Sequence, residues 1–525
     1  MRSSSVTRFS RVAEKAVSED FTPTLRLHPL SWLFVLVASV RQFIVPVIAV
    51  VLFGARDDGE MWGIFIVVPL LIAALWRQML FRYGLGPRGL VIRDGLLFRN
   101  VRQIEYERIE NIDTERNLLH RLLGVAEVRV ETSTGGKPEG LIRVLSLDAV
   151  DALRREVFGH GRGTGAPAVA ARVTEPAGTV LLQLPAAELM RFGFVDNRGM
   201  LVIAAAFGFI SQTGAMGAAG AYLRDHVFDT DIAALGALSL GIVAVGVLVT
   251  IVLCVRLLSL VWALVTLHDF TVTKQGDGLR VRYGLLTRVA LTLRLPRIQA
   301  THQTETLMHR FLGRVSLAVD LAGDGAQQAD ENGTPQMRMR WLAPICTPRR
   351  SLELIRTAFP MLVNDSTVEW RGLAPGARGR LFRKSMLIAT LIGAIPSAFL
   401  LGWSAPLLWL LIIPLAWLHA TQYVRHTAWA LTREALIFRR GWLTRRLSIV
   451  PRNRVQAVHR SASPFDRRKR MAVIAVDTAG ASTLGKIVRV PYLTDADANR
   501  LASELYRSVE EPIRGPRSPA VVSVR

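Results

Sequence analysis

Three arginines at matching places in related stretches are the first residues whose type and spacing could do chemistry. Arg108, Arg297 and Arg454 each follow a glycine by 13 residues. A guanidinium can hold a phosphate or a carboxylate through two parallel hydrogen bonds, so the three could bind an anionic headgroup. The alternative is a structural role, in which each arginine pairs with an acid that recurs 36 residues after the same glycine. We favour the structural role. The recurring acids are Glu131, Asp320 and Asp477.

A second candidate site is the concentration of positive charge in the last 105 residues. From Thr421 onward, 20 Lys or Arg stand against 8 Asp or Glu, so this part carries +12 of the net charge of +23. Near an anionic membrane each cation contributes about 1 kcal/mol of attraction, and Trp442 and Phe465 could reach the interface. A solvated basic face is the alternative. Nucleic-acid binding is disfavoured because no recognised nucleic-acid motif is present. The cluster consists of Arg439, Arg440, Arg445, Arg446, Arg467, Arg468, Lys469 and Arg470.

Catalytic and metal-binding chemistry finds little support. His120 and His309 recur 25 residues after their glycines, but the third stretch has Asp466 at that place. No further ligands follow at metal-site spacing, so we interpret both histidines as structural or surface residues and expect no cofactor. The sequence also lacks a nucleophile elbow, a Walker A loop, a zincin motif and a dinucleotide fingerprint. We therefore expect a protein that is not an enzyme.

Three more arginines, Arg41, Arg77 and Arg256, fall inside or at the ends of apolar segments. A charge within a bilayer is costly and often functional. The simpler interpretation is that these side chains extend to the cytoplasmic interface. The alternative is a transporter or a lipid-handling protein in which they line a polar path. That path would need acidic partners, and the segments contain none.

The elements that position these residues begin with apolar segments. Mean hydropathy is +0.29 and half of the residues are hydrophobic, which indicates several membrane spans. Six apolar segments form three pairs whose first two connectors are short and acidic, while the long stretches between pairs are rich in arginine. The positive-inside rule then predicts an inner-membrane protein with both termini and all large domains in the cytoplasm. The segments are roughly residues 31–54 and 61–81, 199–221 and 233–266, and 385–402 and 405–420.

The stretches between the pairs repeat one another without a gap when aligned on Gly95, Gly284 and Gly441. Alternating residues around each glycine predict a β-hairpin. A further strand, a short helical turn and another strand follow, and each block closes with an amphipathic helix. The first two helical turns end in glycine, as a left-handed cap would. In the third block "FDRRKRM" replaces this turn, so the repeat departs from its pattern there.

These motifs resemble a known bacterial domain. The core "PRIQ" at 296–299, with "NRVQ" at 453–456 and "ERIE" at 107–110, precedes a strand of the type G-x-[VA]-x-[VL]. A pair of spans followed by this motif resembles the bacterial pleckstrin-homology-like domain of YdbS/YdbT-type membrane proteins. The resemblance implies three such domains in tandem and implies no known reaction.

The predicted fold is a mixed membrane protein with six transmembrane helices in three hairpins. Three small antiparallel β PH-like domains, each closed by a C-terminal helix, complete it. We predict a non-enzymatic scaffold or binding protein that engages the lipid bilayer, anionic headgroups, membrane-protein partners or its own copies, and no nucleic acid. The predicted parts are an N-terminal arm (1–30), hairpin 1 (31–82), PH-like domain 1 (83–160), a linker and lead-in (161–198), hairpin 2 (199–267), PH-like domain 2 (268–362), a linker (363–383), hairpin 3 (384–420), PH-like domain 3 (421–510) and a tail (511–525).

Overall fold

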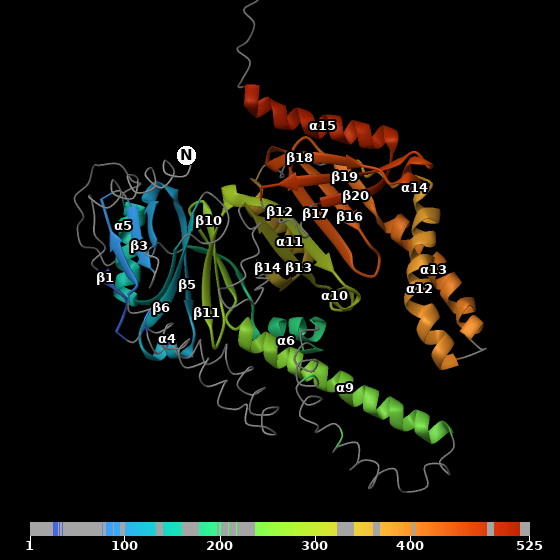
Figure 1. Ribbon diagram of the computed structural model, residues 1–525, viewed down its shortest axis with the longest axis horizontal. Helices are drawn as coiled ribbons and strands as arrows, with labels where there is room; N and C mark the ends of the chain where they lie inside the picture. The colour runs from blue at the N-terminus through green and yellow to red at the C-terminus, as the bar shows by residue number, and fades with distance from the viewer. Residues whose placement is uncertain are drawn as a thin grey trace, which may run out of the picture. The chain divides into compact units, whose positions relative to one another are not determined.

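The computed structural model forms two compact units, which are described separately (Figure 1). The first comprises the described residues up to Gln275 together with Arg280–Thr292, and the second comprises Gly276–Leu279 and the described residues from Leu293 onward. The structure describes residues 25–29, 31, 34, 76, 80–87, 89–94, 100–132, 140–159, 178–196, 199–200, 208, 217, 237–322, 341–360, 368–401, 405–479 and 488–514.

The first unit contains one four-stranded and one seven-stranded sheet, in the orders β1-β2-β3-β4 and β7-β6-β5-β11-β10-β9-β8. Its helices are α4 (Leu118–Leu122), α5 (Leu147–Gly159), α6 (Ala186–Val195) and α9 (Ala237–Thr266), with a 3-10 turn at Tyr106–Arg108. Its strands are β1 (Leu25–Arg26), β2 (Arg82–Leu85), β3 (Gly89–Asp94), β4 (Asn100–Glu105), β5 (Ile109–Arg116), β6 (Val125–Thr132), β7 (Gly140–Ser146), β8 (Thr179–Gln183), β9 (Thr271–Gln275), β10 (Gly278–Tyr283) and β11 (Arg288–Arg294).

The second unit contains a six-stranded sheet in the order β14-β13-β12-β17-β16-β15 and a three-stranded sheet in the order β18-β19-β20. Its helices are α10 (Leu307–Phe311), α11 (Pro348–Ala358), α12 (Ala377–Leu401), α13 (Ala405–His426), α14 (Pro464–Arg467) and α15 (Asp495–Arg514). Its strands are β12 (Ile298–Glu305), β13 (Val315–Leu321), β14 (Trp341–Cys346), β15 (Ala428–Leu431), β16 (Ala435–Arg440), β17 (Arg445–Pro451), β18 (Val455–Ser461), β19 (Met471–Thr478) and β20 (Val488–Thr494).

The predicted repeat is present in all three blocks. Each runs through a hairpin, a strand, a short helix and further antiparallel strands to a closing helix, which is α5, α11 or α15. The segment 161–198 has more structure than the sequence indicated. It is interpreted above as linker and lead-in, and it contains strand β8 and helix α6. β8 pairs with β9 at the edge of the seven-stranded sheet, so this part of the segment belongs to the fold.

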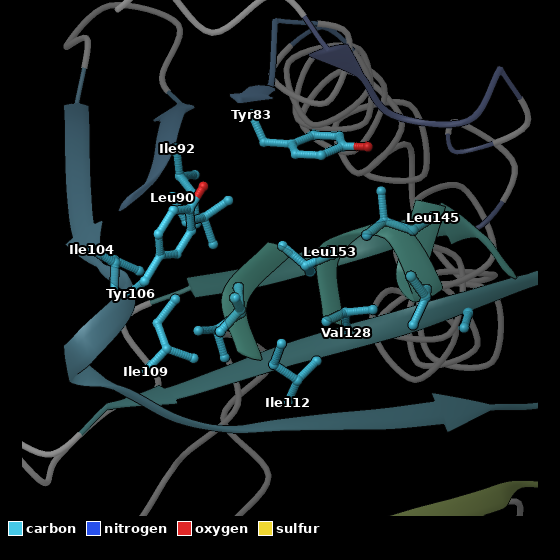
Figure 2. Packing of buried hydrophobic residues seen from close by; sticks show 14 of the residues in the cluster. Tyr83, Leu90, Ile92, Ile104, Tyr106, Ile109, Ile112, Val128, Leu145 and Leu153 are labelled. Carbon is cyan, nitrogen blue, oxygen red and sulfur yellow. The ribbon is translucent and has the colours of Figure 1, made fainter. Parts of the chain in front are cut away.

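Packing of the first repeat follows from the alternation of apolar residues along its strands (Figure 2). Leu90 and Ile104 from one sheet and Val128 from the other meet over Leu153 of α5, and all are almost fully buried. Tyr106 lies in the same cluster, and its hydroxyl donates to the main-chain carbonyl of Gly86 at 2.8 Å. Burial, reinforced by the carboxylate of Glu156, raises the pKa of Tyr106 to about 12. The phenol therefore stays neutral and keeps this bond throughout the physiological range.

Neighbouring repeats share their sheets. β5 of the first repeat pairs antiparallel with β11 of the second, and β12 of the second pairs antiparallel with β17 of the third. In both cases the fourth strand of one repeat lies beside the third strand of the next. Because β-sheet hydrogen bonds run continuously across these junctions, the repeats are joined by main-chain pairing as well as by their connecting chain.

The short helices end in left-handed residues, as the sequence predicts for the first two. Gly124 and Gly313 have φ values of 67° and 62°, and Arg470 takes the same place in the third repeat at 50°. Glycine adopts this conformation without a Cβ penalty, whereas other residues pay roughly 1–2 kcal/mol. The departure of "FDRRKRM" from the pattern is therefore a change of residue at a preserved turn.

Among the described helices, one apolar run, Leu248–Thr266 within α9, is long and apolar enough to cross a membrane. Most of its large side chains are exposed, including Leu248 at 60% and Leu253 at 59%. α12 and α13 are helices where the third hairpin is predicted. Most residues of the predicted segments 31–54, 61–81 and 199–221 lie outside the described part of the chain. The count of six spans therefore stays a prediction.

Candidate functional site

The junction between repeats brings a short helix beside a β-turn. In the second unit Glu305 at the end of β12 lies opposite Arg445 at the start of β17. This register places α10, which follows β12, next to the turn 441–444, which precedes β17. The Arg310 guanidinium of α10 donates to the main-chain carbonyls of Trp442 at 2.6 Å and Leu443 at 2.8 Å. One arginine thus fixes the turn of the following repeat.

The first unit repeats this contact. Arg116 at the end of β5 lies opposite Arg288 at the start of β11, and Arg121 of α4 donates to the carbonyl of Leu285 at 3.0 Å. Arg121 and Arg310 both follow their repeat glycine by 26 residues, and Arg467 has that place in the third repeat. Sequence reasoning missed these arginines, although the gapless alignment that revealed the arginines at position 13 contains them.

Large apolar side chains crowd the same places and are exposed. Leu122 of α4 is 82% exposed and Phe311 of α10 is 84% exposed. The turns add Leu285, Leu286 and Leu443, which are 40%, 46% and 42% exposed. Large apolar side chains that are exposed in a group can mark a site of contact with a protein or a membrane. We call these residues the apolar rim: Leu118, Leu119, Leu122, Leu285 and Leu286 in the first unit, and Leu307, Met308, Phe311 and Leu443 in the second.

The turns of the rim are fixed to long apolar helices. The amide of Leu285 donates to the carbonyl of Val265 at 3.0 Å, inside the apolar run of α9. In the second unit the indole Nε1 of Trp442 donates to Nδ1 of His419 on α13 at 3.0 Å. The turn 441–444 therefore lies alongside α13 rather than beyond its end. Each turn is held at a defined level of a helix that carries exposed leucines.

The predicted cluster of cations separates into two groups. Arg439, Arg440, Arg445 and Arg446 flank the β16–β17 turn, and several of them have protein contacts. The Arg439 guanidinium lies 4.8 Å from the ring centroid of Trp370, and Arg445 lies 3.9 Å from Glu305. Burial, together with the charge of Arg440 and against the attraction of Asp320, lowers the pKa of Arg446. This first group is partly engaged in holding the hairpin.

The second group, Arg467, Arg468, Lys469 and Arg470, is exposed along its whole length. It follows Phe465, which is 59% exposed and lies beneath the Arg380 guanidinium at 4.9 Å from its ring centroid. We call Phe465 and residues 467–470 the basic corner. The corner thus pairs one large apolar side chain with four cations.

The basic corner is tied to the first turn of α12. Arg380 Nε lies 3.2 Å from an oxygen of Asp466, whose side chain is 8% exposed. Burial raises the pKa of Asp466, but hydrogen bonds from Ser463 and Arg380 outweigh it and hold the pKa below its ordinary value. The carboxylate is therefore ionised at neutral pH. It joins the third repeat to the base of a long helix.

Aromatic residues continue this junction along α12 and α13. Phe382 and Trp417 meet edge to face with ring centroids 5.4 Å apart, and the Arg378 guanidinium lies 4.7 Å from the ring centroid of Trp417. Cations over aromatic rings are favourable at the boundary between apolar and aqueous regions. The base of the helix pair thus has the composition of a membrane interface.

The arginines at position 13 end the 3-10 turn of each repeat. Arg297 donates to the carbonyl of Ala322 at 2.7 Å, and Arg108 lies 3.6 Å from Glu105 with both side chains exposed. Asp320, one of the recurring acids, bonds Nε2 of His302 at 2.8 Å. These contacts fit the structural role that the sequence favours. The proposed pairing with the recurring acids stays a prediction.

The residues at position 25 lie three places after the N-cap residue of each short helix. The backbone amides of His120, His309 and Asp466 donate to side-chain oxygens of Asn117, Thr306 and Ser463, respectively. His309 also bonds Thr306 and the hydroxyl of Ser316, both through its ring. Among the described residues no group of three or more His, Cys, Asp or Glu side chains could hold a metal ion. The ring of His309 therefore has a visible structural role in joining α10 to β13.

Buried His309 predicts acid sensitivity. Burial lowers its pKa, so the folded state binds a proton less readily than the unfolded chain. Its stabilising contribution is complete above the ordinary pKa of about 6.5 and is lost as pH falls below that value. We expect hydrogen exchange in α10 to accelerate as pH falls below about 6.5, and the His309→Gln variant to lose this dependence. An unchanged pH profile in that variant would contradict the assignment.

Of the three arginines predicted in or near spans, Arg256 is described. Its guanidinium donates to the main-chain carbonyl of Phe194 at 3.0 Å and lies 5.6 Å from the ring centroid of that residue. Phe194 is in the last turn of α6, where a cation is favoured by the helix dipole. Arg256 therefore anchors α6 to α9, and the interfacial interpretation stays a prediction. Arg41 and Arg77 lie outside the described residues.

Comparison with known proteins gives a consistent picture. The model of the bacterial PH domain family matches residues 33–159, 227–340 and 387–509, once for each repeat. The UPF0699 transmembrane protein YdbT of Bacillus subtilis (strain 168) is 20% identical over 479 residues, which cover 88% of this chain and 94% of that protein. No solved structure shows significant similarity to the chain.

Proposed function

Since the chain belongs to the bacterial PH domain family, we propose that it is a non-enzymatic, multi-span membrane protein whose PH-like repeats serve as a scaffold on the bilayer surface. Its relative from Bacillus subtilis carries the description transmembrane protein and matches most of the chain. We further propose that six spans form three hairpins in the inner membrane, with the repeats and both termini in the cytoplasm. The acidic connectors and arginine-rich stretches support this orientation.

The observation that carries the proposal is the apolar rim. Leu122 and Phe311 are more than four-fifths exposed, and each stands beside a turn fixed to a long apolar helix. Transferring one such side chain from water to an apolar environment yields about 1.5–3 kcal/mol. Several side chains on one rim would hold the repeat firmly against the bilayer. If the same side chains faced water, none of this transfer free energy would be gained.

The heights at which the third repeat is attached along α12 and α13 support contact with the membrane. His419, which holds Trp442, lies roughly 10 Å along α13 from the helix end at His426. The predicted span ends near Ala420, so Trp442 reaches the edge of the apolar zone. The basic corner is tied to Arg380, before the predicted span begins at about residue 384. On the proposed spans, an aromatic side chain would lie at the interface and the cations at the headgroup level, an arrangement that membrane proteins prefer.

The experiment for this proposal reconstitutes the full chain into vesicles of zwitterionic lipid, with and without anionic lipid. A Phe465→Cys variant, with Cys254→Ser, carries an environment-sensitive fluorophore at the basic corner. We expect a blue-shifted emission with anionic lipid that fades as salt is raised, because surface attraction is screened within about 10 Å at 0.1 M salt. Emission that is equal in both kinds of vesicle would contradict docking by the corner.

Matched charge variants complete the design. The triple variant Arg468→Gln, Lys469→Gln and Arg470→Gln removes three cations from the corner. The control removes three exposed cations from α11: Arg349→Gln, Arg350→Gln and Arg356→Gln. The proposal expects the anionic-lipid response to fall in the corner variant and to persist in the control. Equal responses would attribute the effect to net charge alone.

A further inference from the structure

Within the described residues, the first and third repeats carry matching outer strands, each with one sheet neighbour. In both shared sheets the fourth strand of one repeat, β5 or β12, pairs with the third strand of the next, β11 or β17. The corresponding strands of the outer repeats are β18 in the third repeat and β4 in the first. Within the described residues each of them stands at the outer edge of its sheet. These are the same two strand positions that join elsewhere in the chain.

β18 keeps the features that the internal junctions use. α15 covers the face of its sheet through Ala498, Leu501 and Leu505, while Gln456, His459 and Arg460 on the strand stay exposed. Arg467 occupies the place of Arg121 and Arg310, which hold the turn of the following repeat. Its side chain is exposed, and no hydrogen bond or ion pair is assigned to it within the part of the chain that the structure describes.

β4 offers the complementary edge. Asn100, Val101, Arg102 and Gln103 are all exposed, and Val101 shows 47% of its surface. The sequence before β4, Gly95-Leu96-Leu97, repeats Gly284-Leu285-Leu286, the turn that Arg121 holds. An exposed strand edge is a template for pairing with another chain. The equivalents of β4 in the second and third repeats, β11 and β17, each pair with the fourth strand of the repeat before them. A second copy of the same protein presents such a fourth strand, β18.

We propose that β18 of one molecule pairs antiparallel with β4 of a second molecule, so that copies join head to tail and continue the repeat array. The strand registers at the two junctions within the chain predict the register between copies. Thr114 lies opposite Ala290, and His302 lies opposite Ser448. Counted from the repeat glycines, both pairs correspond to His459 opposite Arg102 of the next copy. Because the two surfaces differ, the contact is heterologous and builds a ring or an open chain.

Disulfide trapping tests the register in the full chain. The variant Cys254→Ser, His459→Cys, Arg102→Cys is reconstituted into membranes and oxidised, with Cys346 left in place because it is buried. We expect a ladder or a single closed species of crosslinked copies, since directly opposed strand residues have Cβ atoms about 4.5–5.5 Å apart. The control moves the first cysteine to Arg489, an exposed residue of β20. No crosslinking, or equal crosslinking in the control, would overturn the proposal.

The arginine at position 26 supplies a second, independent test. Arg467→Ala removes the predicted hydrogen bond to the next copy, whereas Arg468→Ala removes the same charge at a place where the other repeats have Leu122 and Phe311. In mass photometry of detergent-solubilised protein, we expect Arg467→Ala to weaken self-association about tenfold, the size of one charge-assisted hydrogen bond. Arg468→Ala should match the wild type. A monomeric wild type, or equal losses in both variants, would contradict the contact.

Discussion

Replacing Asp466 with alanine is expected to open the basic corner and to increase tryptic cleavage at residues 467–470 about 100-fold. The carboxylate bonds both the hydroxyl and the amide of Ser463 and lies 3.2 Å from Arg380. Removing one partner of a buried ion pair costs about 3–5 kcal/mol because the other charge loses its compensation. A loss of about 3 kcal/mol raises the population of the open form roughly 100-fold. Limited proteolysis of the full chain measures this directly.

The matched control is Asp495→Ala, which removes the exposed pair between Asp495 and Arg460. Both of those side chains are more than two-fifths exposed, so solvent screens the pair and its contribution is small. We expect its cleavage rate to stay within about threefold of the wild type. Equal acceleration in both variants would show that Asp466 does not hold the corner.

The ion pair between Asp466 and Arg380 also predicts how the corner responds to low pH. Because the pKa of Asp466 is held below its ordinary value, its stabilisation is complete at neutral pH. That stabilisation is lost only as pH falls below the ordinary carboxyl value of about 3.9. The acid sensitivity of α10 begins at a higher pH, so the two titrations separate in a single pH series.

Replacing Arg310 with alanine is the second change with a large expected effect. Its guanidinium holds two main-chain carbonyls of the next repeat at 2.6 and 2.8 Å. A hydrogen bond to a charged group contributes about 1.5–3 kcal/mol, and partial exposure places the pair near the low end. A loss of about 2 kcal/mol predicts roughly 30-fold faster hydrogen exchange in the turn 441–444. Mass spectrometry of peptides from that turn provides the measurement.

Two comparisons isolate the role of Arg310. Arg310→Lys keeps the charge but replaces the Nη2 group, which donates to both carbonyls, with a shorter and more strongly hydrated ammonium, so it should recover less than half of the lost protection. Arg350→Ala removes an exposed arginine whose partner Glu353 lies three residues away, and should leave the turn unchanged. Protection that survives in Arg310→Ala would mean that strand pairing alone fixes the junction.

Local structure followed from local sequence patterns. The glycine-anchored repeat predicted the hairpins, the short helices and the closing helices, because alternation and left-handed caps depend on neighbouring residues. Arg470 shows the limit of such reasoning. Its sequence departs from the glycine of the other repeats, yet the turn persists at φ 50° because Ser463 and Asp466 cap the helix before it.

The sharing of sheets could not be predicted in the same way. β5 and β11 are separated by more than 150 residues in the chain, and their pairing depends on which strand edges remain free after each repeat folds. Which free strand edges pair with each other is only weakly indicated by a single sequence. β8 was missed for a related reason, since a short exposed strand beside a Gly- and Pro-rich stretch has the composition of a linker.

The candidate site was predicted in part. Charge counting found the cations, but burial and aromatic contacts later divided them into a hairpin group and an exposed corner. The apolar rim escaped notice because Leu122 and Phe311 have the composition of core residues in a short amphipathic helix. In the structure both side chains are more than four-fifths exposed.

The most direct test of the membrane-bound scaffold measures how deep the rim lies. A fluorophore on Phe311→Cys and another on Tyr506→Cys, each in the full chain with Cys254→Ser, are compared in vesicles that contain spin-labelled lipids. Tyr506 is 58% exposed on α15 and serves as the control, since it lies outside the rim. The account predicts blue-shifted emission and strong quenching by shallow spin labels at residue 311, with neither effect at residue 506. Aqueous emission and no quenching at residue 311 would contradict the account.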